Sequence, residues 1–162
     1  IKKYMNINDD IYFLKLAIEL AKENVKNGGG PFGAVIVKDG QIIAKGTNRV
    51  TSHNDPTAHA EIVAIRQACE KLNDFQLTDC IIYSSCEPCP MCLGAIYWAR
   101  PKKLVFAADK FDAANAGFDD SMIYDEIQLP YYDRHLETIN LRIDESLQPF
   151  ELWMSENDKI TY

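Results

Sequence analysis

The stretch CIIYSSCEPCPMCLGAIYWARPKKLVFA, residues 80–107, decides how this chain folds. Residues 80–83 form a short apolar run typical of a buried strand, and residues 103–107 form another. Between them Pro88 or Pro90 can open a helix, because proline is favoured in a first helical turn, and this helix continues through Trp98. Strands that alternate with helices of this length predict an α/β layered domain with helices on both faces of the sheet.

An amphipathic helix is predicted near the N-terminus, over residues 11–25. Asn8 or Asp9 can cap its start, and Gly28 ends it. Apolar residues recur at helical spacing on one face of this segment, at Ile11, Leu14, Ile18, Ala21 and Val25. This face is expected to pack against the sheet.

A hairpin is predicted directly after this helix. Residues 33–37 read as a buried strand, and Asp39-Gly40 is a two-residue turn into the apolar residues 42–44. A hairpin pairs its strands antiparallel, so the sheet is expected to be mixed rather than purely parallel.

Two helices and one strand complete the predicted order. A polar loop over residues 47–55 leads to Pro56, and a helix follows over about residues 58–72. Near the C-terminus, residues 137–143 alternate like a more exposed strand, and residues 149–154 suggest a terminal helix.

Length, charge and cysteine content limit the class of protein. A chain of 162 residues predicts a single domain, here residues 1–162, and 47% hydrophobic residues exclude a disordered or fibrous chain. The net charge of −7 argues against a nucleic-acid partner held mainly by phosphate contacts. No apolar run approaches the ~18 residues of a membrane span. Five cysteines, an odd number without a secretory signal before them, favour a reducing cytoplasm, where close-set cysteines more often bind metal than form disulfides.

Two short clusters carry residue types suited to metal chemistry. Cys89 and Cys92 are three apart in the first turn of a helix, so their sulfurs face the same way, and the helix dipole favours their thiolates. With the imidazole of His59 they form a ligand set suited to Zn²⁺. Three protein ligands leave a fourth position for water, which is typical of catalytic zinc, and Glu61 can move that water's proton.

Two other interpretations of these clusters stay open at this point. Cys86 lies three residues before Cys89, so His59, Cys86, Cys89 and Cys92 can instead close a four-ligand structural site. Such a site would make the chain a non-catalytic, zinc-stabilised interaction domain, and Glu61 would then have no task. His53 and His135 lie among polar residues and are expected to have no chemical role.

His-x-Glu followed by Pro-Cys-x-x-Cys is the signature of the zinc-dependent nucleobase deaminases. Three longer stretches (residues 30–37, 54–61 and 84–100) and the segment Ala-Gly-Phe-Asp-Asp-Ser at 116–121 resemble the short bacterial guanine deaminases of the cytidine deaminase superfamily. The resemblance runs from about Ile11 to the C-terminus, the terminal Tyr162 included.

The resemblance implies a fold, a cofactor and an assembly. The fold is a three-layer α-β-α arrangement around a mixed five-stranded sheet, and the cofactor is one Zn²⁺ per subunit, held by His59, Cys89 and Cys92. It also implies a homodimer in which C-terminal segments are exchanged between the subunits.

The resemblance further implies the reaction and the residues that perform it. Zinc-bound hydroxide would attack C2 of guanine, with Glu61 as proton shuttle, and ammonia would leave to give xanthine. Asp120 would lie close to the reacting end and accept from guanine N–H groups. The residues expected to bind the base are Asn48, Phe32, Tyr162, Ala60 and Trp98.

The nearest rival is the adenosine-to-inosine deaminase that acts on transfer RNA, because it shares the zinc motifs. An RNA-binding enzyme should carry a basic surface. The segment from Glu145 to the C-terminus instead holds four acidic residues and one lysine, Lys159. We therefore expect guanine as a small-molecule substrate, with no nucleic acid and no membrane as partner.

Overall fold

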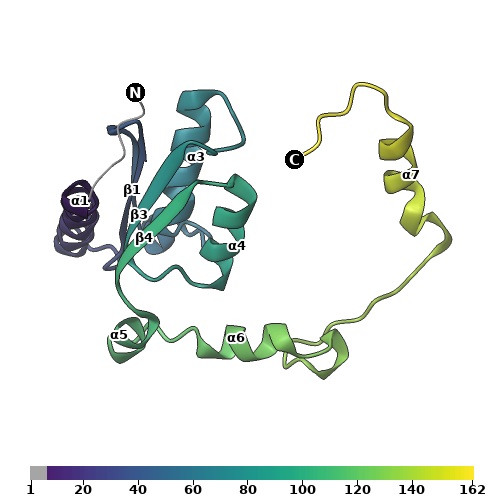
Figure 1. The fold of residues 1–162 in the computed structure, drawn as a ribbon. Helices are drawn as coiled ribbons and strands as arrows, with labels where there is room; N and C mark the ends of the chain where they lie inside the picture. Colours follow the sequence, from purple (N-terminus) through teal and green to yellow (C-terminus); the bar gives the residue numbers. More distant parts are fainter. Residues whose placement is uncertain (1–6) are drawn as a thin grey trace. The chain divides into compact units, whose positions relative to one another are not determined.

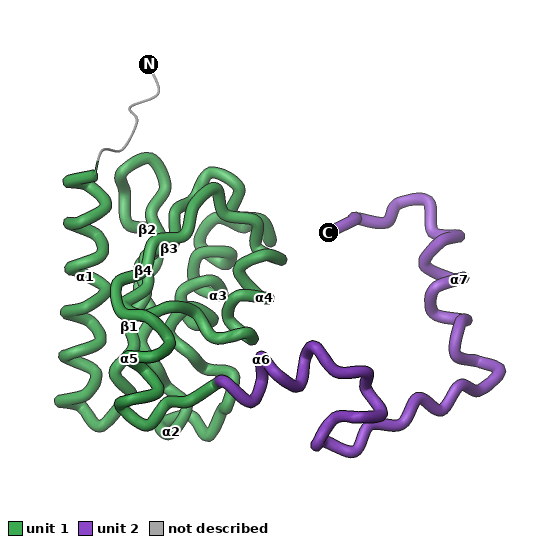
Figure 2. Tube along the Cα trace, turned by 60° about the horizontal axis from the view of Figure 1, so that its bottom comes forward, with its two compact units in different colours: residues 1–120 green, residues 121–162 purple. Residues whose placement is uncertain are grey.

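The computed structural model describes residues 7–162, and by its internal contacts the chain divides into two compact units. Figure 2 distinguishes residues up to 120 from residues 121–162 by colour. The first unit contains the sheet and most of the helices (Figure 1): α1 (Ile7–Lys26), β1 (Gly33–Lys38), β2 (Gln41–Thr47), α2 (Val50–His53), α3 (Ala60–Leu72), β3 (Cys80–Cys86), α4 (Pro90–Ala99), β4 (Lys103–Ala108) and α5 (Lys110–Asn115). The second unit contains α6 (Ser121–Gln128), two single turns of 3₁₀-helix (Tyr131–Asp133 and Asp144–Leu147) and α7 (Gln148–Ser155).

The sheet has the order β2-β1-β3-β4. β1 pairs antiparallel with both β2 and β3. β3 pairs parallel with β4, and the helix α4 connects these two strands in the sequence. Asp39 and Gly40 both have positive φ, as a two-residue hairpin turn requires. The predicted α/β class and the mixed sheet are therefore confirmed.

The predicted fifth strand is wrong, because the sheet formed by residues 7–162 has four strands. Residues 137–143 form no helix or strand, and their apolar side chains are exposed, with Leu141 at 80%. Apolar alternation marks a segment that can line a sheet, but a strand also needs a neighbour for its backbone hydrogen bonds. The predicted loop over residues 47–55 also differs, because it contains the short helix α2.

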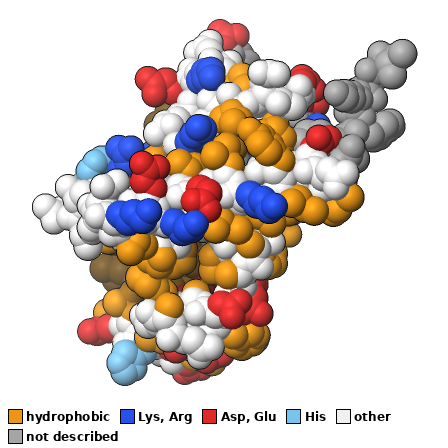
Figure 3. Space-filling model, turned by 90° about the vertical axis from the view of Figure 1, so that its left-hand side faces the viewer, with side chains coloured by type: hydrophobic (Ala, Val, Ile, Leu, Met, Phe, Trp, Pro, Cys, Tyr) orange, Lys and Arg blue, Asp and Glu red, His pale blue; other side chains and the backbone are white. Residues whose placement is uncertain are grey.

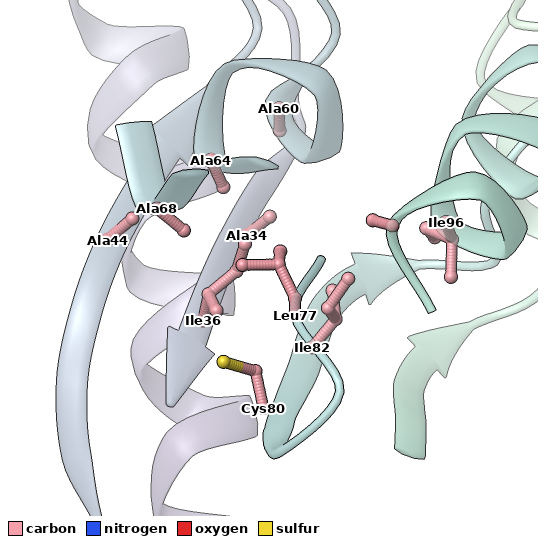
Figure 4. Packing of buried hydrophobic residues seen from close by; sticks show 11 residues of the cluster. Ala34, Ile36, Ala44, Ala60, Ala64, Ala68, Leu77, Cys80, Ile82 and Ile96 are labelled. Carbon is pink, nitrogen blue, oxygen red and sulfur yellow. The ribbon is translucent and has the colours of Figure 1, made fainter. Parts of the chain in front are cut away.

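Two apolar layers hold the sheet between helices. On one face Phe13 and Ala17 of α1 pack with Val35, Ile81 and Tyr83. On the other, the alanine stripe of α3 (Ala60, Ala64 and Ala68) packs on Ala34, Ile36 and Ile82, with Ile96 of α4 beside it (Figure 4).

The inward face of α1 agrees with the predicted one only in part. Ala21 is buried and Leu14 packs on the core as predicted, but Ile11 and Val25 are about half exposed, and Phe13 and Ala17 are buried instead. A Cβ on Gly33 would overlap the backbone of α1 at Ala17, so the helix lies too close to the sheet for larger side chains. The helix also begins before Asn8 and Asp9, which lie in its first turns rather than capping it.

A buried polar network fastens the start of α1 to the sheet. Tyr83 of β3 donates a hydrogen bond from its hydroxyl to Asp10 (2.7 Å), and Lys103 of β4 forms an ion pair with the same carboxylate. Burial alone would raise the pKa of Asp10, but the hydrogen bonds from Lys103 and Tyr83 hold it below its ordinary value. Asp10 therefore remains ionised inside the fold.

Candidate active site

Two helix N-termini meet at the predicted metal ligands. His59 is the N-cap of α3 and Cys89 the N-cap of α4, where Pro90 fixes the first helical position and Cys92 follows in the first turn. The Nδ1 atom of His59 lies 3.6 Å from Sγ of Cys89 and 3.5 Å from Sγ of Cys92. These three donor atoms, from two different helices, thus face one point.

The spacing of the three donors fits a zinc ion. Sulfur at about 2.3 Å and nitrogen at about 2.0–2.1 Å in a tetrahedron lie roughly 3.6 Å apart, which matches the observed nitrogen–sulfur distances. Among the described residues, His59, Cys89 and Cys92 form a group whose ligand atoms all lie within 4.8 Å of one another. Three ligands leave a fourth tetrahedral position for water or substrate.

The surrounding charges prepare this site for a cation. Hydrogen bonds from Cys92 and His59 lower the pKa of the Cys89 thiol to about 4, so this sulfur is a thiolate at neutral pH. The same thiolate raises the pKa of His59, and together with burial it raises the pKa of Cys92. A metal ion that binds here therefore displaces the proton of the Cys92 thiol.

Glu61 lies beside the three donors without being one of them. It is 5% exposed; Oε1 accepts a hydrogen bond from Oγ of Ser84 (3.0 Å), and Oε2 accepts one from Cys92 (3.4 Å). Burial raises the pKa of this carboxyl, so it can hold a proton and return it. That is the property a proton shuttle needs.

Cys86 lines the same cavity but does not belong to the group of three converging donors. Its thiol donates to the carbonyl of Asp109 (3.6 Å), and burial raises its pKa to about 11. A neutral thiol engaged with a backbone carbonyl is not placed as a fourth ligand. The geometry thus favours three ligands over the four-ligand structural site.

A cavity of about 480 Å³ opens onto His59, Glu61 and Cys89. Its volume falls in the range of small-molecule sites. Three of the predicted substrate-contacting residues, Phe32, Asn48 and Asp120, line it as well. The carboxyl of Asp120 has a raised pKa, first because of burial and then because of the Cys89 thiolate.

Two other predicted residues of the first unit, Ala60 and Trp98, do not line this cavity. Ala60 is fully buried in the core between α3 and the sheet, and Trp98 is 65% exposed on α4. Tyr162 belongs to the second unit.

Sequence reasoning missed several residues of the site. Ser84 binds Glu61, while Phe118, Lys110 and Glu87 line the cavity; Phe118 meets Phe32 edge to face at a centroid distance of 5.0 Å. Phe118 stands two residues before Asp120, so its place in the motif was the available signal. For Ser84 no signal was available, because its contact with Glu61 spans 23 residues.

Comparison with known proteins agrees with this geometry. Residues 7–108 match the zinc-binding region of cytidine and deoxycytidylate deaminases. Guanine deaminase of Bacillus subtilis is 60% identical over 151 residues, which cover 93% of this chain and 97% of that protein. The crystal structure of the Bacillus subtilis enzyme superposes with a TM-score of 0.93 and 58% identity, covering 98% of this chain and 99% of that one.

A more distant relative defines the alternative. The tRNA-specific adenosine deaminase of Aquifex aeolicus is 47% identical over 97 residues, covering 60% of this chain and 64% of that protein. The similarity to guanine deaminase thus extends through the second unit, while that to the tRNA enzyme covers much less of either chain. This chain belongs to the family of zinc-binding cytidine and deoxycytidylate deaminases, in the branch of the guanine deaminases.

Proposed function

We propose that this protein hydrolyses guanine to xanthine and ammonia, with zinc held by His59, Cys89 and Cys92 and with Glu61 as proton shuttle. The observation that carries the proposal is the position of Glu61: a buried carboxyl beside three convergent zinc-type donors, at the end of a cavity that Asn48 and Asp120 also line. The relative that matches nearly the whole chain is a guanine deaminase.

The reaction needs a nucleophilic water and two proton transfers. Zinc at this site would lower the pKa of a water and so make hydroxide available near neutral pH. Glu61 takes the proton that the water loses and delivers it to a ring nitrogen as the C2–O bond forms. It then takes the proton of the hydroxyl now on C2 and passes it to the amino group; the C2–N bond breaks, the hydroxyl oxygen becomes the C2 carbonyl of xanthine, and ammonia leaves.

The cavity matches the edges and faces of guanine. Guanine donates from N1 and N2, and the carboxylate of Asp120 accepts such hydrogen bonds. Asn48 supplies an amide for the acceptors of the base, and Phe32 with Phe118 supplies an aromatic wall. A site built for such donors rejects analogues that lack them by about 10⁴–10⁵.

Transfer RNA is the competing substrate, because tRNA-specific relatives share the zinc-binding half of this chain. Charge favours the free base: the chain carries −7, and on the face in Figure 3 acidic side chains lie among the basic ones. The test is to incubate equal amounts of enzyme with guanine and with a tRNA anticodon stem–loop. Xanthine from guanine supports the proposal, and inosine without xanthine contradicts it.

A structural zinc site is tested through Cys86. Because the thiol of Cys86 donates a hydrogen bond to the carbonyl of Asp109, we expect Cys86→Ser to keep full zinc occupancy. That result would mean that the site has three protein ligands. Loss of zinc in this variant would instead support a closed four-ligand site without catalysis.

We also propose a cytoplasmic homodimer in which the segments carrying Tyr162 are exchanged, so that Tyr162 helps close the partner's pocket. All five cysteines are free, which suits a reducing compartment. Apolar side chains of the second unit are exposed in the single chain, as an assembly surface would be. No helix within the part of the chain that the structure describes is long and apolar enough to cross a membrane.

A further inference from the structure

The side-chain amide of Asn24 joins three separate segments next to the cavity. Asn24 lies in the last turns of α1, and its Nδ2 donates to the carbonyl of Gly30 (2.8 Å) and to the carbonyl of Asn48 (2.9 Å). Its own carbonyl accepts from the backbone N–H of Gly29 (2.8 Å). One residue that does not line the cavity therefore fixes two stretches of backbone that do, at Gly30 and at Asn48.

The glycines after α1 allow this arrangement. A Cβ on Gly29 would overlap the amide of Asn24, and a Cβ on Gly30 would lie 3.0 Å from Cγ of Asn48. The chain at Gly29 and Gly30 can thus approach both asparagines only without side chains. Asn24 is not a loose surface asparagine, because the neighbouring backbone is shaped around it.

Three polar groups of Asn48 form hydrogen bonds within the fold: its carbonyl, its backbone N–H and its side-chain Oδ1. Its backbone N–H donates to the carbonyl of Phe32 (3.2 Å), and its Oδ1 accepts from the N–H of Val50 (3.3 Å). Its side chain is 9% exposed and lines the cavity. With Oδ1 engaged, Nδ2 is the atom that can donate to guanine, whose O6 and N7 are acceptors.

We propose that Asn24 is a positioning residue for base binding: by fixing the carbonyls of Gly30 and Asn48, it holds the Asn48 amide in the orientation that recognises guanine. This inference rests on the proposed function. The side chain of Asn24 bonds to Gly30 and Asn48 and makes no direct hydrogen bond to Glu61 or to the zinc-type donors, so its effect is expected on base binding rather than on the proton transfers.

The first test compares Asn24→Ala with Asn27→Ala, a change at an exposed asparagine after the same helix that does not line the cavity. Losing two hydrogen bonds that orient a binding group should raise KM for guanine about tenfold and change kcat less than about threefold. Zinc content should remain at the wild-type level. Asn27→Ala should match wild type in all three quantities.

A double-mutant cycle with Asn48→Ala shows whether Asn24 acts through Asn48. Dissociation constants for 8-azaguanine are measured in the Glu61→Gln background, where turnover does not interfere. If the inference holds, Asn24→Ala weakens binding about tenfold when Asn48 is present and less than about twofold when Asn48 is alanine. Equal effects in both backgrounds would overturn it.

Gly29→Ala provides a second route, because its Cβ would displace the Asn24 amide without removing it. Gly29→Ala should also raise KM for guanine, and it provides the test even if Asn24→Ala does not fold. Unchanged KM in both folded variants, or a loss of kcat and zinc in parallel, would overturn the inference alone. Absence of guanine turnover by the wild-type enzyme would overturn the proposed function and this inference with it.

Discussion

Residues 7–120 enclose a core of buried apolar side chains, whereas residues 121–162 have no buried residue. In the first unit Val35, Ile82 and Tyr83 are completely buried between helices. In the second no residue is buried, and Leu136 and Leu141 are 77% and 80% exposed. A segment that hides so little apolar surface gains little free energy from its own fold. The first unit thus has a core that can hold the residues of the site in place, whereas the second unit exposes apolar side chains that another surface could cover.

The largest effect is expected inside the first unit, at Glu61. Glu61→Gln keeps the shape of the side chain but removes the ionisable carboxyl that accepts and returns the proton, so kcat should fall by about 10²–10⁴. Zinc measured by elemental mass spectrometry should remain at one per subunit. Near-wild-type turnover would remove Glu61 from the mechanism.

The second effect tests the other side of the comparison. If Leu141 is covered in a dimer, Leu141→Asp should raise the dimer dissociation constant by about 10–100-fold, from the lost burial of one leucine. Light scattering over a dilution series measures this constant. Glu137→Gln, a change of charge in the same segment, is the control. An unchanged constant in Leu141→Asp would mean that this side chain is not covered.

A smaller effect is expected from Ser84, whose hydroxyl orients Glu61. Ser84→Ala should lower kcat about tenfold with little change in KM, the value of a well-placed hydrogen bond to a charged group. Its neighbour Ser85 accepts from the N–H of Gly33 instead, so Ser85→Ala should cost stability rather than kcat. Equal kcat losses in the two variants would contradict this role.

The smallest effect concerns the stability of the first unit, through Asp10. Its pKa is lowered in the fold, so its charge stabilises the protein above the ordinary value of 3.8, and this contribution is lost as pH falls below it. Asp10→Asn should therefore lower the unfolding free energy by about 1 kcal/mol at pH 7, since Lys103 is partly exposed. Urea unfolding should show the difference in unfolding free energy shrinking as pH falls below 3.8. A difference that stays constant as pH falls would not come from this ion pair.

The sequence predicted the elements whose signals are local. The turn at Asp39-Gly40 and the helix opened by Pro90 depend on residue types at short spacing. The convergence of His59 with Cys89 and Cys92, 30 and 33 positions away, could be predicted because these residue types are metal ligands. Periodicity placed the inward face of α1 only in part, because the close approach at Gly33 decides which side chains fit there.

Contacts between distant segments could not be predicted where no motif links the two residues. Two such contacts lie 23 and 24 positions apart in the sequence, Ser84 with Glu61 and Asn24 with Asn48. A serine or an asparagine can bond to many partners, so its residue type does not identify the one that it meets. The prediction of a fifth strand was wrong for the same reason: the apolar alternation of residues 137–143 does not show which strand, if any, they would pair with.

Zinc-dependent hydrolysis of guanine by the site in residues 7–120 is tested by removing the metal and restoring it. The purified protein is stripped with a chelator, assayed for xanthine and ammonia from guanine, and assayed again after Zn²⁺ is restored. We expect no product without metal and equal amounts of xanthine and ammonia once zinc is returned. Full turnover by the stripped protein, or no xanthine from the zinc-loaded protein, would contradict it.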